Sequence, residues 1–387
     1  MTETNRGGRK ALAERLDVIR SASGVAALRL QFSARWPAFA DSRPKELIIV
    51  GAAGEGVRLA GHCNDHGILV RAIADDDNAK LGKALGANRV VSIEQLAPLP
   101  KDIPVIVASH RALLPVRRIR QMGFTTVAPL LALQVISPRH FPPHMFHDGL
   151  IEDLYDNIAQ YQKLADLLAD DRSAAVLAAV IQYRLTGEPE VLDPITEWEL
   201  YGAGALLSYA NDEVYVDAGT FDGDSIRLFI ERVAGKFERV YGFEPDPVTF
   251  QRLKMNFAGE PRVVPINAGL YSKTGTLRFD NAGTRGSILS DSGAVVVPVV
   301  GLDEVLKDNR VSYVKMNIEG AELDALDGAA ASIRRWNPKL ALSAYHRPSH
   351  LWQVPAKVKE LDPRYQLYFR QHDGGIIETV CYAKVPD

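Results

Sequence analysis

The 387-residue sequence predicts an α/β protein with an N-terminal Rossmann-like parallel sheet, a helical bridge and a second α/β sheet. Short apolar runs alternate with amphipathic segments, first over residues 45–137 and again from about residue 206. A glycine-rich loop follows the first apolar run of each series, in "IIVGAAGEG" and "VYVDAGTFDG". The last two strand-like runs are joined across Asp373-Gly374-Gly375, which indicates a β-hairpin.

The first half predicts helices, then a sheet, then helices again. Residues 9–40 have a mostly helical pattern. Five strands are expected in "ELIIV", "ILVRAIA", "NRVVSI", "PVIVAS" and "FTTVAPL". A connector rich in proline and histidine follows, "SPRHFPPHMFHDG", and then two helices, in "GLIEDLYDNIAQYQKLADLLAD" and in "RSAAVLAAVIQYRLTG". The second helix should end at Gly187, because glycine commonly terminates helices.

The second half predicts a seven-stranded sheet. Strands are expected in "EVYVDAG", "RVYGFEP", "RVVPINAG", "VSYVKMN", "KLALSAYH", "YQLYFRQH" and "IIETVCYAKV". Five parallel strands closed by a C-terminal antiparallel hairpin are typical of the class I methyltransferase sheet. The predicted division is a helical segment, a Rossmann-like domain, a connector with helical bridge and a methyltransferase-like domain, over residues 1–44, 45–140, 141–205 and 206–387.

Composition excludes several classes of protein. The chain has 45 Lys and Arg against 48 Asp and Glu, a formal net charge of −3, so no strong field favours nucleic acid. Only Cys63 and Cys381 are present, which rules out a disulfide framework and indicates a reducing compartment. The longest apolar stretch, near 127–136, contains Pro129 and is too short to span a membrane. With no secretory pattern at the N-terminus, we expect a cytoplasmic location.

The glycine loop of the second sheet is unusually acidic. Gly219 and Gly223 permit a tight turn at the carboxyl end of a strand, where open parallel sheets bind their ligands. Asp217 and Asp222 would repel a pyrophosphate. The loop therefore favours a ligand with cationic and hydroxyl groups, and S-adenosylmethionine has both.

Glu244 ends the next strand, 25 positions after Gly219. This is the place of the acid that accepts ribose hydroxyls in nucleotide-binding sheets, and charged acceptors form the stronger hydrogen bonds. The alternative is a surface acid in the turn before Pro245.

Five blocks, "VDAGTFDGDS", "YGFEPDP", "INAGL", "VKMNIEGAE" and "SAYHR", resemble the FkbM-type S-adenosylmethionine-dependent methyltransferases over about residues 195–385. The resemblance implies methyl transfer to a hydroxyl oxygen, often of a sugar, polysaccharide or polyketide-type product. The cofactor-binding residues that it implies are Asp217, Gly219, Phe221, Asp222, Gly223, Glu244, Asn267 and Ala268.

The candidate catalytic residues follow the fourth and fifth strands of this sheet. Asn317 stands where the family usually has Asp, and an amide can neither take a proton nor carry charge. Lys315 shares its strand face, and a lysine within a central strand should reach a partner. His346 suits proton transfer near neutrality, with a hydrogen-bonded loop histidine as the alternative. Glu319 is the competing base, whereas Glu322 is expected to accept backbone N–H groups as a first-turn acid.

The N-terminal sheet leaves its role open. The "GAAGEG" loop and Asp75 at the end of the second strand resemble the small Rossmann-like domains of sugar-modifying acyltransferases, which implies a nucleotide or nucleotide-sugar site. The alternative is a degenerate unit kept for dimer contacts, giving a homo-oligomer, or for substrate positioning. His140, His144 and His147 with Asp148 suggest zinc, but prolines break the segment, so we predict a solvated linker and no metal site.

The sequence thus predicts an S-adenosylmethionine-dependent methyltransferase that acts on a hydroxyl of a saccharide or related small molecule. One rival is a nucleotide-dependent oxidoreductase that uses the N-terminal unit. The other is a methyltransferase-fold binding protein with little or no activity, which Asn317 makes plausible.

Overall fold

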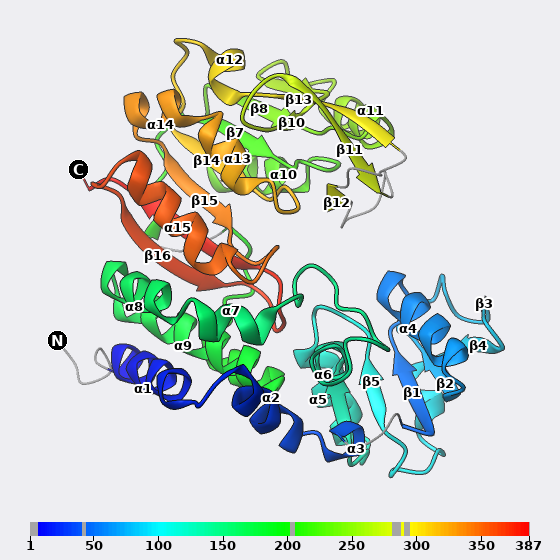
Figure 1. Ribbon diagram of the computed structural model, residues 1–387. Helices are drawn as coiled ribbons and strands as arrows, with labels where there is room; N and C mark the ends of the chain where they lie inside the picture. The colour runs from blue at the N-terminus through cyan, green and yellow to red at the C-terminus, as the bar shows by residue number, and fades with distance from the viewer. Residues whose placement is uncertain (1–6, 41–43, 202–205, 281–287, 290–294, 387) are drawn as a thin grey trace. The chain divides into compact units, whose positions relative to one another are not determined.

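The computed structural model describes residues 7–40, 44–201, 206–280, 288–289 and 295–386 (Figure 1). The chain forms two compact units. The first comprises residues 1–165, 171–198 and 371–378, and the second comprises residues 166–170, 199–370 and 379–387. The four-part division predicted from the sequence stays a proposal.

The first unit is built on a six-stranded sheet of order β3-β4-β2-β1-β5-β6. β1 lies at the centre and pairs in parallel with both β2 and β5, so the strand order reverses between β1 and β5. β3 is a short antiparallel addition at the edge that the sequence did not predict. The strands are β1 Glu46–Val50, β2 Leu69–Ala74, β3 Ala84–Leu85, β4 Asn88–Val91, β5 Val105–Val107 and β6 Val127–Pro129.

Helices flank this sheet, and a separate helical group precedes and follows it. α4 packs on β1 and β2, and α1 packs along α9 (Figure 1). The helices are α1 Gly7–Ser21, α2 Val25–Ala34, α3 Pro37–Ala40, α4 Gly54–Asp65, η2 Ile93–Leu96, α5 Leu113–Gln121, α6 Leu130–Ile136, α7 Leu150–Asp156, α8 Ile158–Leu167, α9 Asp171–Thr186 and η3 Pro189–Ile195.

Two sequence predictions for this region were wrong. The first bridge helix is broken into α7 and α8 at Asn157, which is the C-cap of α7 with a non-helical φ of −109° and ψ of 21°. The connector is not a solvated linker, because Phe141, Phe146 and His147 are buried. Its aromatic side chains pack inward, and only part of the segment faces solvent.

The second unit contains the predicted seven-stranded sheet, with the order β16-β17-β15-β14-β7-β8-β9. Numbered along the chain, this order is 3-2-1-4-5-7-6 when read from β9. β7 lies at the centre, pairs in parallel with β8 and β14, and marks the reversal of strand order. β17 is antiparallel to β15, which confirms the C-terminal hairpin in the predicted fold class. The strands are β7 Val214–Ala218, β8 Arg239–Phe243, β9 Val263–Ile266, β14 Tyr313–Met316, β15 Lys339–Ser343, β16 Gln366–Gln371 and β17 Thr379–Lys384.

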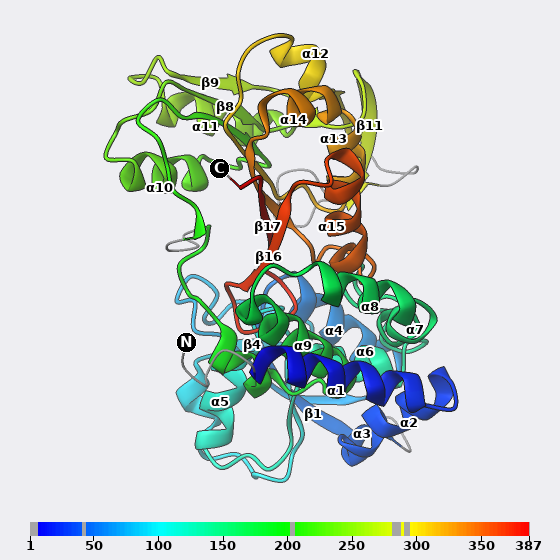
Figure 2. The same ribbon diagram turned by 90° about the vertical axis from the view of Figure 1, so that its left-hand side faces the viewer.

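Helices connect these strands, and α15 packs against α13, α14 and β17 (Figure 2). Apolar side chains from β7, β8, β14 and α10 form the core on one face of the sheet. The helices are α10 Asp224–Arg232, α11 Pro247–Asn256, α12 Leu302–Leu306, α13 Glu322–Asp327, α14 Ala330–Trp336 and α15 His350–Leu361.

A four-stranded sheet of order β10-β13-β11-β12 follows β9, and the sequence analysis assigned no strand there. Val297 and Val299 are buried and Val296 is exposed, so the run "VVVPVV" alternates as a half-buried strand. Pro298 in this run obscured the pattern. The strands are β10 Gly269–Leu270, β11 Gly275–Asp280, β12 Ile288–Leu289 and β13 Val295–Val300.

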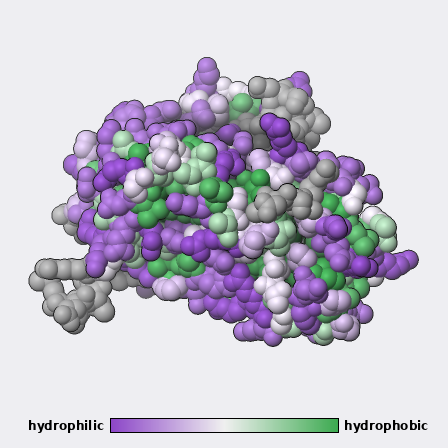
Figure 3. Space-filling model, turned by 60° about the horizontal axis from the view of Figure 1, so that its bottom comes forward, coloured by the Kyte–Doolittle hydropathy of each residue, from purple (hydrophilic) through white to green (hydrophobic). Residues whose placement is uncertain are grey.

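Hydrophilic residues cover most of the face in Figure 3, with apolar residues in small groups between them. No helix in the described parts of the chain is both long and apolar enough to cross a bilayer.

Candidate functional site

The loop after β7 requires glycine at two positions, because other atoms of the protein lie too close to admit a Cβ there. Gly219 has φ +76°, and a Cβ there would lie 1.9 Å from the Asn317 carbonyl oxygen. Gly223 has φ +91°, and a Cβ there would lie 2.2 Å from the Phe257 ring. Phe221 between them also adopts a positive φ of +52°, a conformation that costs energy in a residue with a side chain. The loop is therefore held in one strained shape at the carboxyl end of the central strand.

Asp217 and Lys315 form a buried ion pair beneath this loop. The Lys315 ammonium donates to the Asp217 carboxylate at 2.8 Å and to the carbonyls of Ala218 and Gly219 at 3.3 and 2.9 Å. The Ser225 hydroxyl donates to the other Asp217 oxygen at 2.5 Å. Lys315 thus has the partner that its position in a central strand required, and its three N–H donors fix the loop.

The charge on this loop is partly compensated within the protein. Lys315 faces Asp217, and the exposed Arg227 pairs with Asp222 at 2.9 Å. The repulsion of a pyrophosphate expected from these two carboxylates is therefore weaker than the sequence indicated.

Glu244 follows β8 and is 7% exposed. Its two carboxylate oxygens accept hydrogen bonds from the backbone N–H groups of Phe221 and Asp246, each at 2.9 Å. Burial raises the pKa of Glu244 to about 7, although the two backbone donors oppose that shift. Glu244 therefore ties the turn after β8 to the glycine loop after β7.

Asn267 and Ala268 follow β9. The Asn267 side-chain amide donates to the carbonyls of Glu244 and Pro245 at 2.9 and 3.2 Å, which fixes the turn that carries Glu244. Ala268 is buried beside it. The candidate cofactor residues thus lie at the carboxyl ends of β7, β8 and β9, three neighbouring strands.

Asn317 follows β14 and lies between two tyrosines that sequence reasoning did not identify. Its amide nitrogen donates to the Tyr201 hydroxyl at 3.1 Å, and its amide oxygen accepts from the Tyr345 hydroxyl at 3.3 Å. Tyr345 adjoins the predicted base, but Tyr201 precedes the sheet and no motif marks it.

A carboxylate and histidine cluster occupies the turns after β14 and β15. His346 is fully buried, with its Nδ1 2.8 Å from Glu322 Oε1 and its Nε2 3.6 Å from Glu319 Oε2. Glu319 is 27% exposed and has a strained φ of +54°. The Glu319 oxygen that faces His346 is itself buried.

Glu322 is the buried anchor of the cluster. It accepts from the Ile318 N–H at 2.9 Å, the role predicted for it, but it also faces His346 and, at 3.3 Å, His350. Burial alone would raise its pKa, but the charges and hydrogen bonds of the two histidines hold the pKa of Glu322 below its usual range. His350, the first residue of α15, is the member of this cluster that sequence reasoning did not identify.

In the first unit, the counterpart loop after β1 is closed by Asp75. Its carboxylate accepts from the N–H groups of Ala52 and Asp77 at 2.7 and 2.8 Å and pairs with Lys80 at 3.0 Å. Burial favours a higher pKa, but these donors and the Lys80 charge lower the pKa of Asp75.

The connector histidines do not form one group. His140 lies beside Ser137, with its Nδ1 2.8 Å from the hydroxyl. His144 and His147 instead surround His110, with ring centroids 4.9 and 5.6 Å from it. Burial and the neighbouring His144 lower the pKa of His110 to about 4, and burial also lowers the pKa of His147.

Comparison with known proteins finds similarities to methyltransferases. Residues 217–373 match the family model described as methyltransferase FkbM domain. The fold resembles the crystal structure of a methyltransferase FkbM from Methylobacillus flagellatus KT, with a TM-score of 0.72, 24% identity and coverage of 97% of this chain and 99% of that one. A stretch of 105 residues is 31% identical to the hexuronic acid methyltransferase AglP of Haloferax volcanii. That match covers 25% of this chain and 44% of the relative, less than half of its length.

Proposed function

Because residues 217–373 match the family model described as methyltransferase FkbM domain, we propose that the protein transfers a methyl group from S-adenosylmethionine to a hydroxyl oxygen of a saccharide or related small molecule. The family match carries this proposal. It is supported by the 3-2-1-4-5-7-6 strand order and by the acidic residues at the carboxyl ends of β7 and β8. The two free, buried cysteines support a cytoplasmic site for the reaction.

Glu244 is the proposed acceptor for the ribose hydroxyls of the cofactor. A carboxylate has about four lone-pair positions, and the backbone donors of Phe221 and Asp246 occupy two of them. The remaining positions are available for two hydroxyl donors. Asp217, Gly219, Phe221, Asp222, Gly223, Asn267 and Ala268 shape the rest of the proposed cofactor site.

The transfer itself is a displacement at the methyl carbon. The acceptor oxygen forms the new C–O bond as the C–S bond breaks, and the bonding pair returns to sulfur to give S-adenosylhomocysteine. The hydroxyl proton must pass to a base, a step worth roughly 10²- to 10⁴-fold in rate. Alignment of the two reactants contributes roughly 7 to 11 kcal/mol to lowering the barrier.

Glu319 is the group that we propose to accept this proton. The Glu319 side chain is 27% exposed, whereas the His346 side chain, 3.6 Å from its Oε2, is fully buried. His346, oriented by Glu322, then acts as a positioning residue that stabilises Glu319 in its strained conformation. The competing arrangement has His346 Nε2 take the proton directly after Glu319 moves aside. Lys315 and Asn317 hold the loops around this site.

The choice of a saccharide as the acceptor is the most specific part of the proposal. It is supported by the hexuronic acid methyltransferase among the relatives and by the hydroxyl-directed activity expected of the family. A hexuronic acid would add a carboxylate to the acceptor, so uronic-acid glycosides and their neutral counterparts are the first pair to compare.

The proposal is tested with the full-length protein by calorimetry and by methyl transfer. S-adenosylhomocysteine should bind, NAD should not, and labelled methyl groups should appear on a uronic-acid glycoside. Binding of NAD with no binding of S-adenosylhomocysteine would indicate an oxidoreductase. Cofactor binding with no transfer to any hydroxylated acceptor would indicate a binding protein.

The base is assigned by two variants. We expect Glu319→Gln to lower turnover by roughly 10²- to 10⁴-fold with S-adenosylmethionine affinity unchanged, because the base acts on the acceptor alone. His346→Ala should cost less, and His346→Gln should recover part of the loss by restoring a polar neighbour. A larger loss in His346→Ala than in Glu319→Gln would assign the proton to His346.

A further inference from the structure

Three side chains of the first unit converge where its strand order reverses. Glu55 lies in the first turn of α4, directly after β1, and His110 follows β5, the neighbour of β1 on its other side. His144 comes from the connector after α6. Ligands of open α/β sheets bind outside the carboxyl ends of the strands at such a reversal.

We propose that Glu55, His110 and His144 bind a divalent transition-metal ion such as zinc. One carboxylate oxygen and one ring nitrogen of each histidine lie within 4.8 Å of one another. Two imidazoles and a carboxylate are the donor set of catalytic zinc sites that keep a fourth position open. All three side chains are half-buried, so an ion can reach them from solvent.

A fourth histidine supplies an independent observation. His147 is 4% exposed, and its Nδ1 hydrogen-bonds to the Gln134 amide oxygen. The Gln134 amide nitrogen faces the Pro142 carbonyl, which fixes this orientation and leaves the lone pair of His147 on Nε2. Among the described residues, His147 Nε2 has no hydrogen-bond partner. A buried nitrogen lone pair beside His110 is suited to accept from a water molecule on the bound ion.

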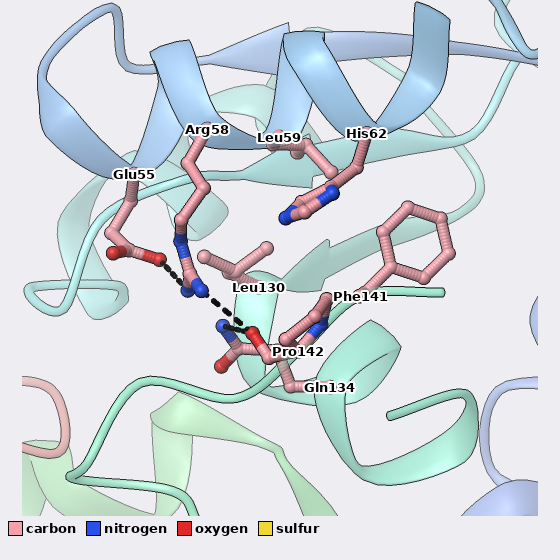
Figure 4. Close-up of a pocket in the computed structure, with 8 residues that line it drawn as sticks. All are labelled: Glu55, Arg58, Leu59, His62, Leu130, Gln134, Phe141 and Pro142. Carbon is pink, nitrogen blue, oxygen red and sulfur yellow. Dashed lines mark hydrogen bonds and ion pairs between the residues drawn. The ribbon is translucent and has the colours of Figure 1, made fainter. Parts of the chain in front are cut away.

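The surroundings hold the proposed ligands in place, although Pro142 and Pro143, between His140 and His144, argued against a fixed scaffold. Arg58 donates to Glu55 Oε2 at 2.6 Å and to the Pro142 carbonyl at 2.7 Å, which ties α4 to the connector (Figure 4). The His110 carbonyl accepts from the Ile376 N–H at 3.2 Å. The first of these contacts orients the Glu55 carboxylate, as partners of ligating groups do in metal sites, and the last fixes the backbone that carries His110.

One wall of the proposed site is apolar. The Phe146 ring lies 4.8 Å from the His110 ring and 4.2 Å from the His144 ring, centroid to centroid. In Figure 4, Leu59 and Leu130 line the pocket next to Glu55 and Arg58. An apolar shell limits water around the ion and strengthens its bonds to the protein.

The experiment titrates the chelator-treated full-length protein with Zn²⁺ by calorimetry and with Co²⁺ by visible absorption. We expect one ion per chain, with a cobalt spectrum typical of histidine and carboxylate ligands. His110→Ala and His144→Ala should each raise the zinc dissociation constant by more than about 100-fold, since loss of an outer partner alone costs about 10- to 100-fold. His140→Ala is the matched control and should bind zinc as the parent does.

Glu55→Gln keeps the shape of the third ligand but removes its charge, so it tests the site even if the histidine variants fold poorly. Circular dichroism checks the folding of every variant. Glu55→Gln should also weaken zinc binding markedly. The proposal is overturned if the parent binds neither metal, or if the His110→Ala/His144→Ala protein binds zinc as tightly as the parent does.

Discussion

The two parallel sheets of this chain are built alike at the carboxyl ends of their central strands. Gly51 after β1 and Gly219 after β7 both have positive φ, +106° and +76°. Each donates its N–H to the last residue of the next strand, and each has no room for a Cβ because of a facing carbonyl, that of Ala108 or of Asn317. The same local framework therefore supports two different sets of side chains.

The acid after the second strand shows the difference most clearly. Asp75 and Glu244 both accept two backbone N–H groups, but Asp75 also pairs with Lys80. Among the described residues no lysine or arginine pairs with Glu244, and burial raises its pKa to about 7 while the pKa of Asp75 is lowered. Lys80 neutralises Asp75 and completes the hydrogen bonding of its turn. Glu244 has no such pairing in the described parts of the chain, so its carboxylate can still accept hydrogen bonds from a ligand.

The centre of the sheets differs in the same way. Ile49 of β1 faces Ile106 of β5, and at the corresponding place Asp217 of β7 faces Lys315 of β14. An apolar pair in the first unit is thus replaced by a buried ion pair in the second. Burying two charges is costly, which indicates that this pair serves the loop above it rather than stability.

The largest effect is expected from breaking this ion pair. Lys315→Ile should lower the stability of the second unit by about 3 to 5 kcal/mol, because it leaves the buried Asp217 charge alone. Asp217→Ile/Lys315→Ile copies the pair of the first unit and should recover most of that loss. Hydrogen exchange of the β7 and β14 amides measures both values. If the double variant is as unstable as the single one, the ion pair is not the reason for the loss.

The same double variant separates stability from function. It lacks the Lys315 ammonium that fixes the carbonyls of Ala218 and Gly219, so S-adenosylhomocysteine should bind more weakly even where folding is restored. If the double variant binds S-adenosylhomocysteine as tightly as the parent does, the Asp217–Lys315 pair has a purely structural role.

The next effect concerns the two acids. Glu244→Gln should raise the dissociation constant of S-adenosylhomocysteine by roughly 10- to 100-fold, because a hydrogen bond to a charged group is worth about 1.5 to 3 kcal/mol. Asp75→Asn is the matched control in the other sheet and should leave this constant unchanged. Calorimetry on the full-length proteins gives both values. Equal effects of the two changes would contradict the distinction between a structural acid and a ligand-binding one.

A pH titration sharpens this comparison. Glu244 with a pKa of about 7 is mostly protonated at pH 6 and mostly charged at pH 8, and the charged form is the better acceptor for ribose hydroxyls. Affinity for S-adenosylhomocysteine should therefore fall as pH decreases through 7, by at most about tenfold per pH unit. Glu244→Gln should lose this dependence. A parental affinity that is flat from pH 6 to 8 would mean that the ligand does not bind the charged carboxylate.

Sequence reasoning identified the periodic and chain-local parts of this architecture. The strand runs, the glycine loops and the acids that follow the strands are local patterns, and the predicted fold class is confirmed. The tyrosines around Asn317 and the link between Glu322 and His350 were missed, because they depend on residues that are distant in sequence or start a helix. The split of the helix at Asn157 and the small sheet of β10 to β13 were missed because single polar or proline residues obscured weak periodicities.

The connector shows a different limit. Its histidines suggested zinc only as a local group, and the prolines argued against a fixed scaffold. The structure combines His144 with Glu55 and His110 from two other segments, and spacing within one segment cannot reveal such a combination. The roles of all these side chains stay predictions.

The smallest effect is expected from substitutions of Asn317, whose carbonyl faces Gly219 as the carbonyl of Ala108 faces Gly51. Asn317→Asp introduces the acid usual in the FkbM-type methyltransferases that the sequence resembles, and the Tyr201 and Tyr345 hydroxyls can both donate to the new carboxylate. Only one neutral hydrogen bond of about 1 kcal/mol is exchanged, so turnover should change by less than about tenfold. Asn317→Ala copies the first unit and leaves both hydroxyls without this partner, so it should cost more. Initial rates of methyl transfer compare the two variants. A rise well above tenfold in Asn317→Asp would instead mean that an acid at this position takes part in the chemistry and that the amide limits the present enzyme.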